Sequence, residues 1–216
     1  MFNACGEDTD DGNGGSTTTS NEVIVSENIT GNTTWSKDKT YILAGRISVV
    51  SGVTLTIEPG TIIKGQAGTG ANATALLVAR GGKLMAEGTA TEPIIFTSVA
   101  DEIKSGEIAS PNLPNDFNGL WGGLIVLGDA PCSLSGDVTE IAIEGVPPTD
   151  KNGLYGGTNA EDNSGVIKYV SVRHGGANIG EGNEINGITF GGVGSGTTVE
   201  NVEVVANQDD GIEWFG

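Results

Sequence analysis

The sequence predicts an all-β protein and, more narrowly, a parallel β-helix, a solenoid in which short strands stack coil upon coil. One observation is alternation: Val53, Leu55 and Ile57 are separated by Thr54 and Thr56, as in a strand with one buried face. Another is composition, since 36 of the 216 residues are glycine and the apolar residues are mostly Val, Ile, Leu and Ala. Such a mixture is typical of many short strands joined by tight turns.

The third observation is a repeat near the end of the chain. The segment "IKYVSV" from Ile167 aligns with "VENVEV" from Val199, 32 residues later, and "NGITFGG" from Asn186 aligns with "DGIEWFG" from Asp210, 24 residues later. The eight-residue difference corresponds to one loop, around "GANIGEGN". Repeats of roughly 20 to 50 residues built from short strands favour a β-helix over a propeller or a leucine-rich repeat array.

The chain divides into three parts. Residues 1–22 have a Gly/Ser/Thr/Asp composition that cannot bury enough apolar surface to fold, which predicts a flexible acidic tether. Residues 23–46 are expected to form an N-terminal cap, and residues 47–216 the coils, beginning with "ISVVSGVTLTIEPGTIIKG". Because the sequence finishes on two aromatics, Trp214 and Phe215, we expect the helix to be truncated there, with further coils in a longer protein.

Charge and cysteine content argue against several classes of function. The 28 acidic residues outnumber the 10 basic ones, the net charge is −18, and Lys and Arg form no cluster, so binding to nucleic acid is not expected. Cys5 and Cys132 are far apart and have no CxxC spacing, which argues against a zinc site or a disulfide framework. No apolar run approaches the roughly 18 residues of a membrane-spanning helix.

The residues around Cys5, "FNAC" followed by "GEDTDDGNGG", resemble the cleavage site and acidic export signal of surface lipoproteins of the Bacteroidota type. This resemblance implies that a lipid on Cys5 anchors the protein to the outer membrane, at the cell surface. Secretion without an anchor is the alternative location. The competing interpretation of Cys5 is an incidental thiol in a flexible leader.

Longer phrases carry a second resemblance. The segments "GVTLTIEPGTIIKG", "GGKLMAEGTATEPIIFTS", "GLWGGLIVLG" and "DNSGVIKYVSVRHGG" are similar to parts of bacterial right-handed parallel β-helix proteins of the pectate-lyase-like superfamily. The resemblance covers about residues 40–216. It supplies the right-handed sense of the predicted helix, which periodicity does not give. A fold shared with this superfamily does not by itself define a function.

Asp209 and Asp210, in "QDDG", are the first candidates for catalysis. Polygalacturonase-like β-helix enzymes use aspartates on one sheet face as general acid and water-activating base, and the motif resembles one of theirs. However, the repeat places Asp210 over Asn186, Asn152 and Asn118, each followed by glycine. Asn-Gly and Asp-Gly are typical of tight corners that need a positive φ, so we interpret Asp210 as a corner residue. Asp209 is not explained by the repeat.

Arg173 and the single histidine, His174, follow a predicted strand in "SVRHGG". A histidine can act as a general base near neutral pH, and an arginine can bind the carboxylate of a sugar acid. The repeat places Ala206 at the position of His174, which favours the alternative, a pair of solvated turn residues. We therefore assign no catalytic residue.

A glycine-rich stretch, "TDKNGLYGGTNAEDNSG", gathers four oxygen donors suited to a calcium ion, namely Asp150, Glu161, Asp162 and Asn163. Their spacing matches neither an EF-hand loop nor a calcium-binding nonapeptide repeat. The competing interpretation is a solvated acidic loop. Apart from this calcium candidate, no cofactor is expected.

Four aromatics, Trp121, Tyr155, Phe190 and Trp214, each come shortly after a glycine-rich corner. Exposed in a row, they would form a platform on which sugar rings stack. Packed inward, they would fill the interior of the solenoid. The sequence is compatible with both arrangements.

Together these features predict an anchored surface protein whose β-helix binds carbohydrate or mediates adhesion without catalysis, because solenoid repeats present similar groups at regular spacing. A polysaccharide lyase or glycoside hydrolase is the alternative, and a structural spacer is the second alternative. An enzyme needs two carboxylates, or an acid with Arg or Lys, in one cleft. A glycan-binding protein needs a row of exposed aromatics, and a spacer needs neither.

Overall fold

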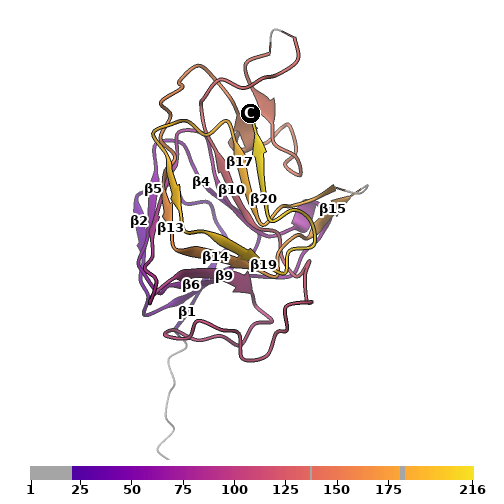
Figure 1. Cartoon of the computed structure of the whole chain (residues 1–216). Coiled ribbons are helices and arrows are strands. Elements are labelled where there is room, and N and C mark those ends of the chain that lie inside the picture. Colours follow the sequence, from indigo (N-terminus) through magenta and orange to yellow (C-terminus); the bar gives the residue numbers. More distant parts are fainter. Residues whose placement is uncertain (1–20, 137, 181–182) are drawn as a thin grey trace, which may run out of the picture.

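A computed structural model, which describes residues 21–136, 138–180 and 183–216, has the fold that the sequence predicts (Figure 1). The chain forms a right-handed parallel β-helix with three parallel sheets, called here sheets A, B and C. Each strand pairs with the strand at the same position in the neighbouring coil, so the backbone hydrogen bonds run along the helix axis.

The strands of each sheet follow in spatial order. Sheet A contains β1 (Glu22–Val25), β3 (Thr40–Leu43), β6 (Ile62–Gly65), β9 (Ile94–Ser98), β14 (Val170–Arg173) and β19 (Glu203–Val205). Sheet B contains β4 (Arg46–Val49), β7 (Ala75–Val78), β10 (Leu124–Leu127), β17 (Ile188–Gly191) and β20 (Ile212–Phe215). Sheet C contains β2 (Thr33–Trp35), β5 (Thr54–Ile57), β8 (Lys83–Glu87), β13 (Gly165–Lys168) and β18 (Thr198–Glu200).

Short elements lie outside these sheets. They are two antiparallel pairs, β11 (Ile141–Ala142) with β12 (Leu154–Tyr155) and β15 (Asn178–Gly180) with β16 (Asn183–Glu184), and two 3-10 turns, η1 (Gly70–Asn72) and η2 (Lys151–Gly153). The pairs belong to insertions between coil strands, and the coils themselves stay parallel.

The register confirms the repeat found in the sequence. Ile167 pairs with Val199 in sheet C, and Ile188 pairs with Ile212 in sheet B. The boundary expected at residue 47 is different in the structure, because β1, β2 and β3 already pair within sheets A and C. The coils therefore begin at β1, and residues 23–46 are part of them.

The core consists of inward side chains stacked in columns from coil to coil. In sheet A one column runs through Val23, Tyr41, Ile63, Phe96, Val172 and Val204. Its central members are fully buried, with Ile63, Phe96 and Val172 at 0% exposure. Similar columns from sheets B and C close the interior, so each coil is stabilised by the apolar surface of its two neighbours.

Two corners of the coil repeat an unusual backbone conformation. Tyr169 and Asn201, one coil apart, have φ values of 48° and 51°, and His174 and Ala206 have φ values of 59° and 55°. Four non-glycine residues in the left-handed region are strained individually. Their recurrence at stacked positions shows that the corner geometry is set by the coil and not by the side chain.

The corner predicted around Asp210 is partly wrong. Asp210 does stack on Asn186, because Gly187 N donates to Asp210 O (3.0 Å). Asn118 and Asn152 do not occupy this corner: the pairing of β10 with β17 places Gly122 there, and Asn152 lies in η2. Neither Asn186 nor Asp210 has a positive φ.

Close packing requires the glycine after Asn186. A Cβ on Gly187 would collide with the side chain of Val204 and would lie 2.7 Å from Gly211 O, so this glycine admits the neighbouring coil. A Cβ on Gly211 would make ordinary contact with Val204 (3.6 Å), so close packing does not account for the glycine after Asp210.

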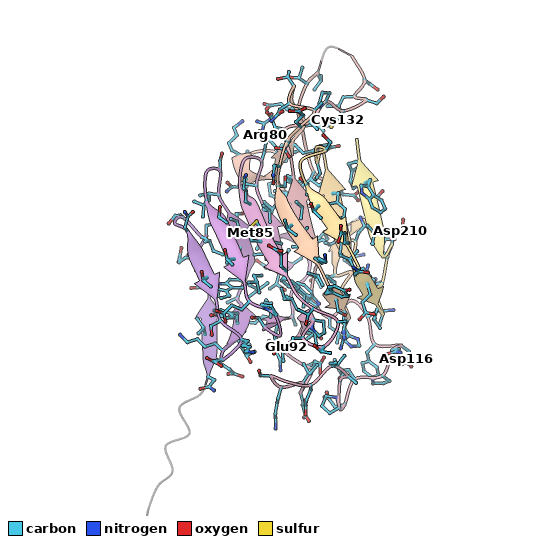
Figure 2. All side chains as sticks on the ribbon, turned by 60° about the vertical axis from the view of Figure 1, so that its left-hand side comes forward. Arg80, Met85, Glu92, Asp116, Cys132 and Asp210 are labelled. Carbon is cyan, nitrogen blue, oxygen red and sulfur yellow. The ribbon has the colours of Figure 1, made fainter. Side chains whose placement is uncertain are left out.

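Insertions cover the outward faces of two sheets. Residues 99–118, which we call the strap, cross sheet A, where Ile103 packs on Ile62 and Ile95. Residues 138–164 pack on sheet B, where Ile143, Val146 and Tyr155 belong to a second apolar cluster outside the helix. The outward side chains of sheet C, such as Met85, remain partly exposed (Figure 2). Figure 1 shows the strap beneath β9 and β14.

The column in sheet A gives a stability test. Phe96→Ala should lower the free energy of unfolding by about 3–5 kcal/mol, because it removes a fully buried ring that the coils cannot close around. Urea unfolding followed by circular dichroism measures the change. Thr56→Ala, on the outward face of sheet C, is the control and should change stability by less than about 0.5 kcal/mol. Equal effects would contradict the assignment of this column to the core.

Candidate functional site

The strap is held over sheet A by three basic side chains from the coils. Each contacts a main-chain carbonyl oxygen of the strap. The contacts are Lys64 Nζ to Asp101 O, Arg173 Nη1 to Ile108 O and His174 Nδ1 to Phe117 O, each 2.6 Å long. The outward face of sheet A therefore meets the strap through these polar groups and through Ile103, and hollows remain beside the contacts.

Four hollows lie along the strap and share lining residues. Their volumes are about 600, 130, 420 and 270 Å³, in order from the N-terminal strands toward β19. Asp38 and Ser105 line the first and second, Pro93 and Ile108 the second and third, and Ile108 and Arg173 the third and fourth. We call this series the strap groove.

The strap groove crosses the strands of sheet A. Glu22 of β1 lines its first hollow, and Glu203 of β19 lines its third. These positions lie on the first and last of the six strands of sheet A, five spacings of about 4.8 Å apart, so the groove is roughly 24 Å long. It is long enough for several units of an extended polymer.

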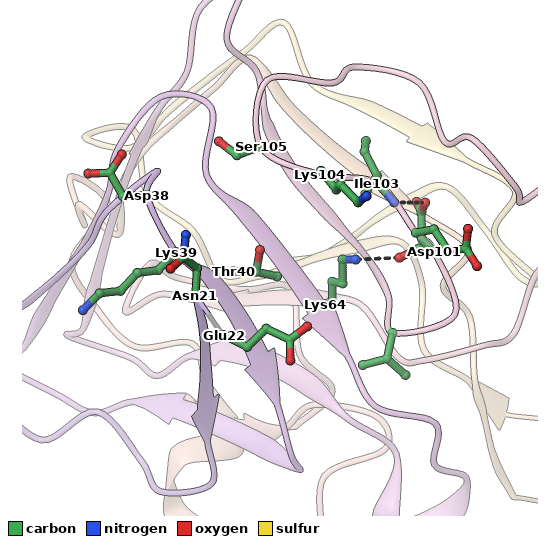
Figure 3. Close-up of a pocket in the computed structure, with 12 residues that line it drawn as sticks. Asn21, Glu22, Asp38, Lys39, Thr40, Lys64, Asp101, Ile103, Lys104 and Ser105 are labelled. Atoms are coloured by element: carbon green, nitrogen blue, oxygen red, sulfur yellow. Dashed lines mark hydrogen bonds between the residues drawn. The ribbon is translucent and has the colours of Figure 1, made fainter. Parts of the chain in front are cut away.

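The largest of the four hollows is lined mainly by polar residues and contains Lys64, an amine whose pKa is lowered (Figure 3). Lys64 is 9% exposed, and burial lowers its pKa below the ordinary value of 10.5, with Asp101 and Glu22 opposing the shift. Figure 3 shows the side chain of Glu22 extending toward Lys64, with Thr40 nearby in the same hollow. None of the ion pairs within the described residues includes Lys64.

Asp101 organises the strap next to Lys64. Its side chain is 1% exposed and accepts hydrogen bonds from Thr97 Oγ1 (2.9 Å), Ile103 N (3.0 Å) and Ser110 Oγ (2.7 Å). These donors engage both carboxylate oxygens, and this carboxylate therefore holds the loop in place.

The interpretation of Arg173 and His174 as solvated turn residues is wrong. They are 8% and 1% exposed, because the strap covers them. Arg173 Nε also contacts Ser171 Oγ (2.7 Å), and Nη2 lies 3.4 Å from Glu203 Oε1. Both residues line the fourth hollow. They belong to the wall of the strap groove, where they donate to the strap.

The structure places the aspartate pair away from this groove. Asp209 and Asp210 are exposed in the turn between β19 and β20, and neither lines any of the four hollows. Asp210 is labelled at the edge of the coils in Figure 2. Its main-chain oxygen accepts from Asn207 Nδ2 (2.9 Å). The pair is in an open turn and not in a cleft with a second acid.

The four calcium-ligand candidates do not share a common partner. Asp150 pairs with Arg46 (3.3 Å), Asp162 Oδ2 accepts from Ser164 Oγ (3.0 Å), and Asn163 Oδ1 accepts from Gly165 N (2.9 Å). Glu161 is exposed. Within the part of the chain that the structure describes, no three His, Cys, Asp or Glu side chains are placed to hold an ion. The predicted grouping of these donors is therefore wrong.

The aromatics do not form an exposed row. Trp121 is 0% exposed and donates from Nε1 to Arg173 O (2.8 Å), and Tyr155 is 6% exposed in the cluster outside sheet B. Phe190 is 1% exposed inside the helix and stacks on Trp214, with ring centroids 5.7 Å apart. Trp214, at 67%, is exposed on the last strand. Burial rules out a sugar platform built on Trp121 and Tyr155.

The comparisons with known proteins agree with this architecture. A family model described as a pectate-lyase like beta helix domain matches residues 27–216. The chain belongs to this family. A search of the curated proteins and a search of the solved structures gave no significant match. The family thus defines the fold and leaves the ligand to be inferred from the site.

Other predictions concern residues or properties that the structure does not test. Cys5 and nearly all of the predicted tether lie outside the described residues. In the described part of the chain, no helix has the length and apolarity that crossing a membrane requires.

Sequence reasoning missed Lys64 and Asp101. In the sequence, Lys64 follows two isoleucines in "TIIKG", a strand that carries apolar residues on both faces. A strand buried on both faces predicts that something covers its outward side, and its lysine is then buried too. Asp101 has no comparable signal, because its environment depends on how residues 97–110 fold.

The lowered pKa of Lys64 predicts a pH dependence of stability. Between its pKa in the folded chain and 10.5, the unfolded chain binds more protons than the folded one, so stability rises with pH through that window. Lys64→Met abolishes this gain. The difference in free energy of unfolding, wild type minus Lys64→Met, should increase from neutral pH to pH 10.5. A constant or falling difference would show that Lys64 is not desolvated.

Proposed function

We propose that this protein binds an extended polysaccharide in the strap groove without cleaving it. The observation that carries the proposal is the series of four adjoining hollows across sheet A. A linear polymer lying along the helix axis meets a new strand every ~4.8 Å, so successive units meet similar positions of successive coils.

The lining suits sugar rings, which have apolar faces and hydroxyl edges. In the third hollow the apolar side chains of Pro93 and Val202 adjoin Thr89, Asn201 and the half-buried Tyr169. An aromatic ring beside aliphatic groups contacts the face of a pyranose, and the amide and hydroxyl groups contact its edge. This combination supports carbohydrate as the ligand class.

Binding is favoured over hydrolysis by how the carboxylates are used. Hydrolysis of a glycosidic bond needs two carboxylates flanking the bond. Three of the carboxylates that line the strap groove are engaged: Asp101 accepts three hydrogen bonds, Glu92 pairs with Lys37 (2.8 Å), and Glu203 pairs with Arg173 (3.4 Å). These engaged carboxylates are positioned to stabilise the wall.

A polysaccharide lyase is the second candidate, and Lys64 is the observation that favours it. An amine with a lowered pKa in a hollow of about 600 Å³ can accept a proton nearer to neutral pH than an exposed lysine can. In that reaction Lys64 would take the proton from a sugar carbon, the C–H electrons would form a double bond as the bond to the leaving oxygen breaks, and water would give that oxygen a proton. The elimination product carries a new double bond and absorbs ultraviolet light.

One screen tests both candidates. Full-length protein is incubated with polygalacturonate, alginate, cellulose, mannan and chitosan, and binding, reducing ends and ultraviolet absorbance are measured. Binding without product supports our proposal. A rise in absorbance that Lys64→Arg abolishes would establish the lyase instead, because arginine keeps its proton. If the protein neither binds a polysaccharide nor releases a product, a structural spacer is the function that remains.

A groove variant then locates the binding site. Tyr169→Asn should weaken binding of the polysaccharide identified by about tenfold, the effect of losing one aromatic contact. Asparagine is chosen because Asn201 occupies the same corner one coil later with nearly the same φ. Met85→Ala, on sheet C, is the matched control and should bind normally. An unchanged affinity for Tyr169→Asn would place the ligand outside the third hollow.

We also propose that a lipid on Cys5 anchors the protein at the outer surface of the cell. The support is the sequence "FNAC" and the acidic residues that follow it. Metabolic labelling with a palmitate analogue should mark the wild-type protein and Cys132→Ala but not Cys5→Ala. An unlabelled wild-type protein would remove the anchor and favour secretion.

A further inference from the structure

We propose that the middle of the strap, residues 104–118, is a lid that Arg173 and His174 latch shut over the third and fourth hollows. The inference deepens the proposed function, because it describes how a polymer reaches the strap groove. It is argued from the contacts of the strap with the coils, from its internal hydrogen bonds and from the exposure of its apolar side chains.

The first end of the strap is fixed to sheet A. Asp101 accepts from Thr97 on β9, its main-chain oxygen accepts from Lys64 on β6, and Ile103 is 1% exposed against Ile62 and Ile95. Among the described residues, Ile103 is the strap side chain that joins a buried apolar cluster. This end has both polar and apolar attachment, as a hinge requires.

The other end is also fixed, at the return to the coil. Gly119 N donates to Gly175 O (2.7 Å), and Leu120 N donates to His174 O (3.0 Å). Gly119 has a φ of 65°, a conformation that favours glycine, so the chain changes direction there. The strap is therefore a loop whose two ends are fixed to the coils.

Between these ends the attachment is sparse. In the described chain three hydrogen bonds tie residues 104–118 to the coils: Arg173 Nη1 to Ile108 O, His174 Nδ1 to Phe117 O, and Ser105 Oγ to Lys37 O (3.1 Å). The side chains of Ile108 and Phe117 are each 50% exposed. With little apolar surface buried, opening this section exposes little new apolar area to water.

The strap nevertheless has internal order. Ser110 Oγ donates to Asp101 and accepts from Leu113 N (3.0 Å), while Asn112 contacts Glu102 N and Ala100 O (each 2.9 Å). These bonds join its first half to the fixed end. They lie beside the pivot, so the lid turns about residues 100–102, and only its contacts with Arg173, His174 and Lys37 have to break.

The lid explains how a polymer enters a covered groove. Ile108 lines the second, third and fourth hollows, and Arg173 holds its carbonyl oxygen. With the latch closed, a chain would have to be threaded lengthwise past Ile108. With the latch open, the chain can be laid in from the side. Arg173 and His174 are then free to donate to ligand oxygens in place of the strap carbonyls.

The experiment uses the free protein and the three arginines of the chain, Arg46, Arg80 and Arg173. Phenylglyoxal labelling resolved by peptide mass spectrometry measures how often each guanidinium is accessible. His174→Ala should raise the labelling rate of Arg173 about fivefold, the effect of losing one latch hydrogen bond. Arg46 and Arg80 should keep their wild-type rates. Alanine fits the backbone, because Ala206 has nearly the same φ one coil later.

Val172→Ala separates a latch effect from general loss of stability. Val172 is 0% exposed on the inward face of β14, next to Arg173 but away from the strap. This variant should unfold more easily and yet label Arg173 at the wild-type rate under native conditions. Equal acceleration in both variants, or no acceleration in His174→Ala, would overturn the lid.

Because no polysaccharide is present, this result stands apart from the binding screen. If labelling shows that the latch opens and the screen finds no binding to any of the five polysaccharides, the binding function is overturned and the lid remains. A latch that stays closed beside confirmed binding would overturn the lid and require entry from the groove ends.

Discussion

The hydrogen-bonded pairing between coils is the constraint on which the rest of the structure depends. Each strand of the three sheets pairs with strands of the neighbouring coils. The backbone N–H and C=O groups of β9, for example, pair with β6 and β14, and this pairing does not depend on the length or sequence of the loops. A loop of any length can leave one strand and return to the next. The strap and the cover of sheet B are two uses of this freedom.

The covering loops turn an ordinary solenoid surface into a site. On an open sheet, a lysine at position 64 and an arginine at position 173 would be solvated. Under the strap they are about nine-tenths buried and donate to main-chain oxygens. Burying cations opposite neutral carbonyls is less favourable than opposite carboxylates, and the pKa of Lys64 is lowered accordingly. The hollows beside them belong to the same arrangement.

The sequence predicted the coils better than the site. Ile167 and Val199, or Ile188 and Ile212, could be aligned because stacked coils need apolar residues at equal intervals. Asn118 was misplaced because "NGLWGG" looks like a corner, while pairing across sheet B depends on the apolar residues that follow it. A short turn motif such as Asn-Gly can recur for several structural reasons. Apolar residues recur at equal intervals in the strands for one reason, which is the stacking of the coils.

The residues of the strap groove could not be derived in the same way. His174 was interpreted as solvated because Ala206 is its equivalent, and the repeat contains no information on a loop that covers one coil and not the next. Tyr155 is ambiguous in the sequence for the same reason. Burial outside the helix depends on contacts between insertions and coils, which are distant in sequence and have no period.

The attachment of the strap has a consequence for how such a site can change. Its acceptors are the carbonyl oxygens of Asp101, Ile108 and Phe117, which every residue type would provide at those places. The donors, in contrast, are particular side chains on the coils. Apart from Asp101, Ile103, Ser110 and Asn112, whose side chains hold the loop, strap residues that line the groove can therefore be exchanged, altering what the groove accepts, while the three donors keep the loop in place. The molecule separates the part that can be varied to suit a new ligand from the part that must stay as it is.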